Sequence, residues 1–206
     1  MRALIWDLGG TLVDTYPDVD RALAGALTAH PTAQLLHEVA TLTRISSSHA
    51  ISTLAARHGV SEQELRAAYE ATKIHWRTSP PPVADGARDL LEAVHRADSL
   101  NLVATHRERQ SAQSLLDALE LPIDDMVCAP DGFARKPDPE MIRELLRRHS
   151  LPADQAIAVG DRPADIAAAE AAGVRGWLLV TPGIPLEPPT DRPISSLREL
   201  LPLFTS

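Results

Sequence analysis

The chain has 206 residues, of which 44% are hydrophobic and 23% are charged, as in an ordinary soluble globular protein. Its formal net charge of -8 argues against nucleic acid or an anionic membrane as the main partner. A single cysteine, Cys128, excludes an internal disulfide and a cysteine-based zinc site, and no apolar stretch approaches membrane-spanning length. We therefore expect a cytoplasmic monomer or homodimer with no nucleic-acid or membrane partner.

The first predicted element is a short buried strand over residues 3–6, which ends on Asp7. Gly9, Gly10 and Thr11 follow at once. Glycines allow the backbone to turn closely, so that amide groups can approach an anionic ligand. In open α/β sheets the active-site crevice lies at the C-terminal ends of the strands. Asp7 is therefore either a turn residue or a functional carboxylate, and later segments decide between the two.

Residues 17–77 are predicted to form four helices and no strand, because apolar residues recur there with helical spacing. Gly59 is expected to end the third helix. Ser61 and Glu64 have the spacing of a capping box that begins the fourth. Three prolines at 80–82 then predict an extended connection.

After residue 100 the pattern alternates between short apolar runs and helices, which predicts right-handed crossovers and a mainly parallel sheet. The fold class is therefore α/β, with a core of residues 1–14 and 83–206 that is interrupted by an all-helical insert, residues 15–82. The segment 182–193 is proline-rich and predicts an irregular loop. The remaining strands are expected over 101–105, 126–129, 156–159 and 176–180, and the remaining helices over 107–119, 138–149, 163–172 and 195–203.

Polar side chains follow several of the predicted strands. Asp7 and Thr105 end two of them, and Asp161 follows a third, with Asp165 four residues later. Lys136 precedes a predicted helix. Because the ends of parallel strands meet at one edge of a sheet, we expect these residues to converge. Together they offer a carboxylate nucleophile, a hydroxyl, an ammonium group and oxygen ligands for Mg²⁺, which suits phosphoryl transfer through an aspartyl-phosphate.

The order and spacing of these motifs resemble the haloacid dehalogenase superfamily of hydrolases, in particular its phosphoglycolate phosphatase-like members. The matching motifs are Asp7-Leu8-Gly9-Gly10-Thr11-Leu12, Thr105, Lys136-Pro137, and Gly160-Asp161 with Asp165. The resemblance implies a Rossmann-like core with a helical cap and a Mg²⁺-dependent phosphatase that acts on a small phosphorylated metabolite.

The resemblance also implies a role for each motif residue. Asp7 would be the nucleophile, and Thr105 and Lys136 would hold the phosphoryl oxygens. Gly10 and Thr11 would contribute to substrate binding through the glycine turn. The implied metal ligands are Asp7, the Gly9 carbonyl, Asp161 and Asp165.

One position departs from the pattern of the superfamily, whose first motif usually has a second aspartate two residues after the nucleophile. Gly9 stands there in this chain. A positioned acid/base group contributes about 10²–10⁴-fold to a rate. Three alternatives follow: the substrates have good leaving groups, another group such as His106 replaces the acid, or hydrolysis is slow and the chain serves in binding or regulation.

Three further residues have two interpretations each. His106 and Arg107 either begin a helix that faces solvent or face the crevice beside Thr105, where they would bind substrate. Arg44 begins a polar stretch, residues 44–49, that is either a cap loop binding a second anionic group or a plain interhelix loop with Ser48 as N-cap.

Two other reactions of the superfamily are weaker alternatives. Haloacid hydrolysis dispenses with the metal, whereas the pair Asp161 and Asp165 favours a bound cation. Phosphonate cleavage would need a lysine from the insert, where Lys73 is the only one.

Overall fold

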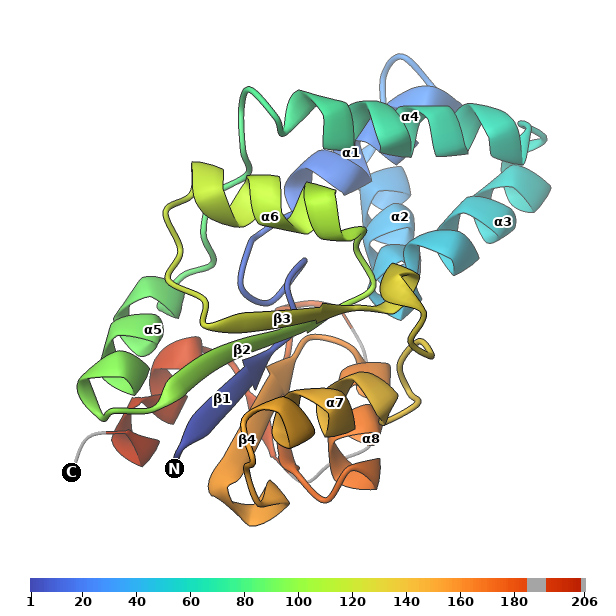
Figure 1. Ribbon diagram of the computed structural model, residues 1–206. Coiled ribbons are helices and arrows are strands. Elements are labelled where there is room, and N and C mark those ends of the chain that lie inside the picture. Colours follow the sequence, from blue (N-terminus) through green and yellow to red (C-terminus); the bar gives the residue numbers. More distant parts are fainter. Residues whose placement is uncertain (185–191, 205–206) are drawn as a thin grey trace. The chain divides into compact units, whose positions relative to one another are not determined.

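The computed structural model describes residues 1–184 and 192–204. The chain divides into two compact units, Met1–Val13 with Pro82–Ser206, and Asp14–Pro81 (Figure 1). The two segments of the first unit meet where the chain leaves it and returns to it. Val13, the last residue before the second unit, forms an antiparallel bridge there with Val83. Among the described residues no helix has both the length and the apolar character that crossing a membrane would require.

The first unit is built on a six-stranded sheet in the order β3-β2-β1-β4-β5-β6, with every pair of neighbours parallel. This arrangement confirms the predicted α/β, Rossmann-like class. Its central strand β1 is buried along its whole length, as expected for a strand covered on both faces. The strands are β1 Ala3–Trp6, β2 Leu100–Thr105, β3 Asp125–Cys128, β4 Ala156–Gly160, β5 Arg175–Leu179 and β6 Pro193–Ile194.

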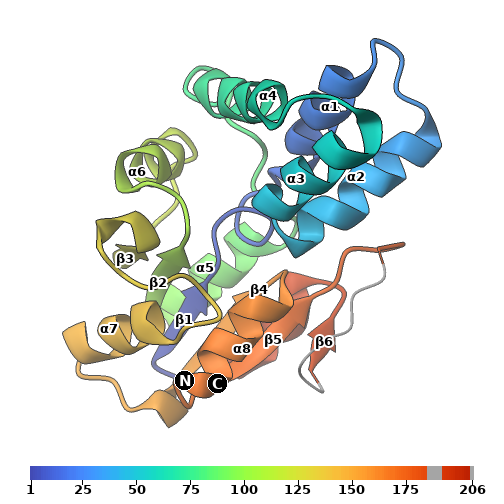
Figure 2. The ribbon, with the colours of Figure 1, turned by 90° about the vertical axis from the view of Figure 1, so that its right-hand side faces the viewer.

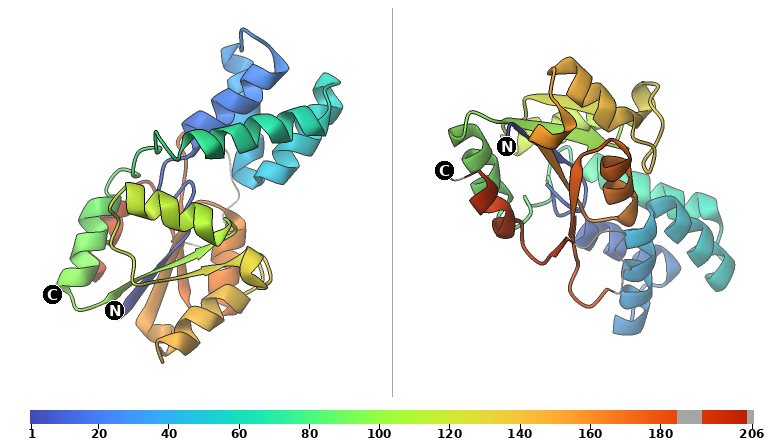
Figure 3. Two further views of the ribbon diagram at one scale, coloured as in Figure 1. Left: turned by 45° about the horizontal axis from the view of Figure 1, so that its top comes forward. Right: turned by 90° about the horizontal axis from the view of Figure 1, so that it is seen from below.

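Helices cover both faces of this sheet, and successive residues of β1 alternate between two hydrophobic clusters. Leu4 and Trp6 pack in one cluster with α5, α6 and the 3-10 helix η3, while Ala3 and Ile5 pack in the other with α7 and α8 (Figure 2). The segment η3 lies beside α5 (Figure 3). The helices are α5 Ala87–Arg96, α6 Arg109–Ala118, α7 Glu140–Arg148, α8 Pro163–Ala171, η1 Ala129–Asp131, η2 Ala153–Gln155 and η3 Leu197–Leu203.

The second unit consists of four helices around a hydrophobic core of its own, which includes Leu23, Leu54 and Trp76. Gly59 ends the third helix in the left-handed conformation, and the capping box of Ser61 and Glu64 begins the fourth, both as predicted. The helices are α1 Tyr16–Leu27, α2 Ala33–Ile45, α3 Ser47–His58 and α4 Glu62–His75.

Two α-helices of the first unit begin later than the sequence predicts, for local reasons. Helix α6 begins at Arg109 rather than at residue 107, because the Arg107 amide donates to the Thr105 hydroxyl at 3.1 Å in a turn. Helix α7 begins at Glu140, whose amide donates to Asp138 Oδ1 at 2.9 Å. The cap position is thus Pro139, not the predicted Asp138.

Three features of the first unit were not predicted. Helix α5 has a clear apolar stripe of Ala87, Leu90, Leu91 and Val94, but its N-cap residue is Gly86, which has no side chain to cap the helix. Strand β6 has two residues and pairs with the end of β5. The last helix is a 3-10 helix that contains Pro202. Of the loop predicted over 182–193, residues 185–191 lie outside the described part of the chain.

Candidate active site

The register of the sheet brings the ends of three strands together. Trp6 of β1 pairs with Val103 of β2 on one side and with Val159 of β4 on the other. The Asp7 amide continues this ladder, donating to the Val159 carbonyl at 2.9 Å. Asp161 directly follows β4, and Thr105 is the last residue of β2. The predicted convergence of these strand ends is therefore a direct consequence of the parallel pairing.

The glycine turn after β1 positions a side chain as well as the backbone. The Leu12 and Val13 amides both donate to the Leu8 carbonyl, and the Gly10 amide donates to the Val13 carbonyl at 2.8 Å. Gly10 has a φ of 102°, in the region that favours glycine. Its amide is thus used inside the turn. Thr11 is fully buried, and its hydroxyl donates to Asp161 Oδ1 at 2.7 Å, so the turn holds one of the acidic residues.

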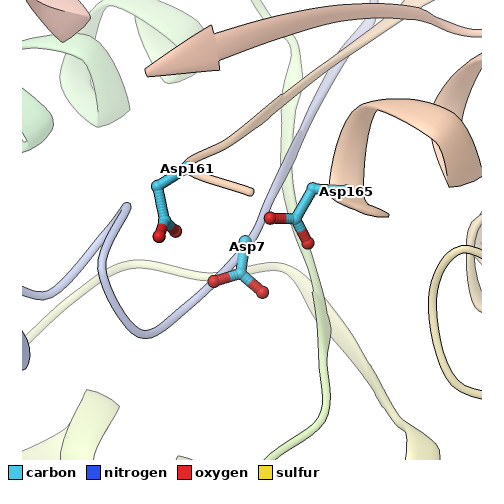
Figure 4. Close-up of side chains that lie close together, drawn as sticks. All are labelled: Asp7, Asp161 and Asp165. Atoms are coloured by element: carbon cyan, nitrogen blue, oxygen red, sulfur yellow. The ribbon is translucent and has the colours of Figure 1, made fainter. Parts of the chain in front are cut away.

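Three carboxylates form a cluster at this edge of the sheet. Asp7, Asp161 and Asp165 point toward one another (Figure 4), and one oxygen of each lies within 4.8 Å of the others. Asp165 sits in the first turn of α8, where its Oδ2 accepts the Arg162 amide at 3.0 Å. Helix N-termini favour negative charge, which stabilises a carboxylate there.

Gly160 allows Asp165 to approach the sheet, and sequence reasoning did not identify it as a site residue. A Cβ at position 160 would lie only 2.3 Å from Asp165 Cβ, far inside van der Waals contact. No side chain other than hydrogen fits there. The signal in the sequence was the spacing of Gly160 and Asp165, but the contact depends on the angle at which α8 packs on β4.

Lys136 lies between two of the three acids. Its ammonium group donates to Asp7 Oδ1 and to Asp165 Oδ1, both at 2.7 Å, and its side chain is 3% exposed. Burial lowers the pKa of Lys136, but the negative charges of Asp165 and Asp7 outweigh this effect and raise the pKa above its usual range. The lysine is therefore charged, and it fixes the orientation of both carboxylates.

The residues of this cluster fit a divalent cation. Three carboxyl groups and one ammonium group gather here. Burial raises the pKa of Asp165, although the positive charge of Lys136 opposes this effect. A bound cation would oppose the rise further, because it favours the charged carboxylate. Hard cations such as Mg²⁺ take oxygen ligands at about 2.0–2.1 Å, so opposite ligands lie roughly 4.2 Å apart. The carboxylate oxygens, within 4.8 Å of one another, are close to that span. Asp7, Asp161 and Asp165 are thus the candidate ligands of a metal ion.

The second predicted motif lies at the end of β2. Thr105 is buried and its hydroxyl accepts the Arg107 amide at 3.1 Å. The Arg107 guanidinium donates to Ser111 of α6 at 3.1 Å. His106 Nε2 accepts the backbone amide of Lys136 at 2.8 Å. The structure therefore joins His106 to the loop that carries Lys136, residues 132–139, which we call the lysine loop. The position of His106 next to Thr105 did not indicate this contact.

Arg44 belongs to the helical unit, where it has partners of its own. Its guanidinium is buried, pairs with Asp20, and stacks on the Tyr16 ring at 3.7 Å from the centroid. Arg44 and Ile45 end α2, and Ser46 caps α3, so the predicted interhelix loop over 44–49 with Ser48 as N-cap was wrong. The sequence could not indicate the Asp20 pairing, because the two residues lie on different helices.

The fold and the cluster together point to a class of hydrolases. Its features here are a parallel α/β sheet, an aspartate after the first strand, a buried lysine and two further aspartates at the edge of the sheet. The chain matches the family model described as haloacid dehalogenase-like hydrolase over residues 4–178. It therefore belongs to the haloacid dehalogenase-like hydrolases, and the expected enzyme class is confirmed.

Two curated relatives and one solved structure that the chain resembles are phosphatases by name. The chain is 33% identical over 187 residues to phosphoglycolate phosphatase from Rhodospirillum rubrum, covering 84% of this chain and 77% of that protein. It is 27% identical over 190 residues to phosphoglycolate phosphatase from Aliivibrio fischeri, covering 87% and 84%. A predicted phosphoglycolate phosphatase from Haemophilus somnus shares the fold, with a TM-score of 0.78 at 22% identity and coverage of 100% and 98%.

Proposed function

We propose that the chain is a Mg²⁺-dependent phosphatase that hydrolyses a small phosphorylated metabolite through an aspartyl-phosphate on Asp7. The observation that carries this proposal is the joint placement of the three carboxylates and Lys136 at one edge of the sheet. The names of the curated relatives make phosphoglycolate the first substrate to test.

The proposed reaction has two steps, each with its own role for the side chains. An Asp7 carboxylate oxygen bonds to phosphorus while the bond from phosphorus to the ester oxygen breaks. Water then attacks the phosphorus of the acyl-phosphate, which releases inorganic phosphate and restores the carboxylate. Lys136 and the Thr105 hydroxyl would stabilise the charge on the phosphoryl oxygens. A Mg²⁺ ion held by Asp7, the Gly9 carbonyl and Asp161, with Asp165 in support, would supply further positive charge at the phosphoryl group.

Gly9 favours a second candidate function. The resemblance predicts a carboxylic acid at this position, and glycine offers no group that could protonate the leaving group. A chain that binds a phosphorylated ligand and hydrolyses it slowly or not at all would have the same cluster. Substrates with good leaving groups, such as aryl phosphates, would still react in a true phosphatase of this kind.

The test measures phosphate release from a panel that includes phosphoglycolate, alkyl phosphates and an aryl phosphate, with MgCl₂ and with EDTA. We expect Mg²⁺-dependent release that Asp7→Asn and Asp161→Asn abolish. Asp117→Asn is the matched control, because Asp117 is exposed and its carboxylate accepts a hydrogen bond from Gln113 of its own helix. Absence of release from every substrate, together with calorimetric binding of inorganic phosphate, would favour the binding function.

A further inference from the structure

His106 and Lys136 lie 30 residues apart and are joined by one hydrogen bond. The Lys136 amide donates to His106 Nε2 at 2.8 Å. A ring nitrogen that accepts a hydrogen bond carries no proton, so the proton of the neutral ring is on Nδ1. The hydrogen bond therefore selects both the charge state and the tautomer of His106.

The surroundings of His106 also favour the neutral ring. The side chain is partly buried at the end of β2. Burial, and then the positive charge of Lys136, lower the pKa of His106 from 6.5 to about 4. A ring with this environment holds no extra proton near neutral pH, which leaves it unsuited to protonate a leaving group there.

The bond to His106 ties the lysine loop to the sheet. Two other hydrogen bonds of this loop are local: the Ala134 amide donates to Glu140 at 2.6 Å, and the Asp138 amide donates to the Arg135 carbonyl at 3.0 Å. The His106 bond instead connects the loop to the end of β2. The backbone it holds is that of Lys136, whose ammonium group lies 2.7 Å from both Asp7 and Asp165.

We propose that His106 is a positioning residue that does not transfer a proton. Its Nε2 holds the Lys136 backbone and thereby places the Lys136 ammonium group between Asp7 and Asp165. The effect of this contact on catalysis rests on the proposed function. Gly9 left open whether His106 replaces the missing acid, and this inference excludes that alternative.

The test compares His106→Gln with His106→Leu. The glutamine amide oxygen can take up about the place of Nε2 and accept the Lys136 amide, whereas leucine fills the space without an acceptor. We expect His106→Leu to lower kcat about 10–100-fold, as a displacement near 1 Å does in an active site. His106→Gln should recover most of that loss and keep the wild-type pH profile. Equal losses in both variants, or a limb of the pH profile that disappears in His106→Gln, would overturn the proposal.

A second measurement does not depend on activity. Hydrogen exchange of a peptide that spans Lys136 should be faster in His106→Leu than in the wild type, and close to wild type in His106→Gln. Unchanged exchange in His106→Leu would contradict the proposed contact. If the wild-type chain released no phosphate from any substrate, the proposed function would fail, and the exchange result would still decide the role of His106.

Discussion

Substitution of Gly160 by alanine tests whether the position of Asp165 controls the active site. The added Cβ would lie 2.3 Å from Asp165 Cβ and 2.7 Å from its Oδ2. Carbon atoms in favourable contact are about 3.5–4.0 Å apart, so one of the two residues must move by roughly 1.2–1.7 Å. Because Asp165 is held by Lys136 at 2.7 Å, a shift of that size would stretch this bond beyond hydrogen-bonding range.

The expected effect of Gly160→Ala on catalysis is larger than its effect on stability. Misplacement of a site residue by about 1 Å costs on the order of 10²-fold in rate. Overpacking a well-packed interior costs about 1–3 kcal/mol in the free energy of unfolding, which leaves a typical domain folded. We therefore expect a folded variant whose kcat/KM is reduced about 100-fold or more.

The assay measures Mg²⁺-dependent phosphate release beside urea unfolding, with Gly25→Ala as the matched control. A Cβ at Gly25, in the last turn of α1, would meet no atom within 4 Å. Alanine there should raise stability by about 0.4–1 kcal/mol and leave turnover unchanged. A Gly160→Ala variant with wild-type kcat/KM would refute the reasoning, since Asp165 would then be either movable without consequence or unimportant.

Three further predictions concern single groups of the site. Gly9→Asp should raise turnover on alkyl phosphates more than on aryl phosphates in parallel steady-state assays, because it supplies an acid that only poor leaving groups need; equal changes would mean that the acid is already replaced. Lys136→Met should lower the free energy of unfolding in urea by about 3–5 kcal/mol, because it leaves Asp7 and Asp165 without the ammonium group that pairs with both, and an unchanged midpoint of urea unfolding would count against the ion pairs. Because the pKa of His106 is lowered to about 4, the unfolded chain takes up a proton between pH 6.5 and 4 that the folded chain does not. The free energy of unfolding should therefore decrease by at most about 3 kcal/mol as the pH is lowered from 6.5 to 4. Urea titrations at several pH values should show that His106→Gln lacks this part of the decrease.

The sequence predicted that the strand ends converge because parallel strand pairing leaves little freedom at those ends. Once residues 3–6, 101–105 and 156–159 are identified as neighbouring buried strands, Asp7, Thr105 and Asp161 must lie at one edge. The alternation of Leu4 and Ile5 between the two hydrophobic clusters follows from the strand period in the same way. These features depend on local pattern and topology alone.

Contacts set by tertiary packing were out of reach. Nothing in the spacing of His106 and Lys136 indicates that a ring nitrogen accepts a backbone amide from a loop 30 residues away. The pairing of Arg44 with Asp20 depends likewise on how two helices meet. Helix α5 was missed although its apolar stripe is regular, because Gly86 provides no side-chain cap to mark its beginning.

The central claim is that Asp7 forms a covalent bond to phosphorus during turnover. The most direct measurement is mass spectrometry of the chain after acid quenching during turnover of an aryl phosphate with MgCl₂, followed by proteolysis. The account predicts a phosphoryl group on the peptide that contains Asp7, absent with EDTA and absent in Asp7→Asn, which should also have no turnover. Full turnover by Asp7→Asn, or a phosphoryl group on another residue, would contradict it.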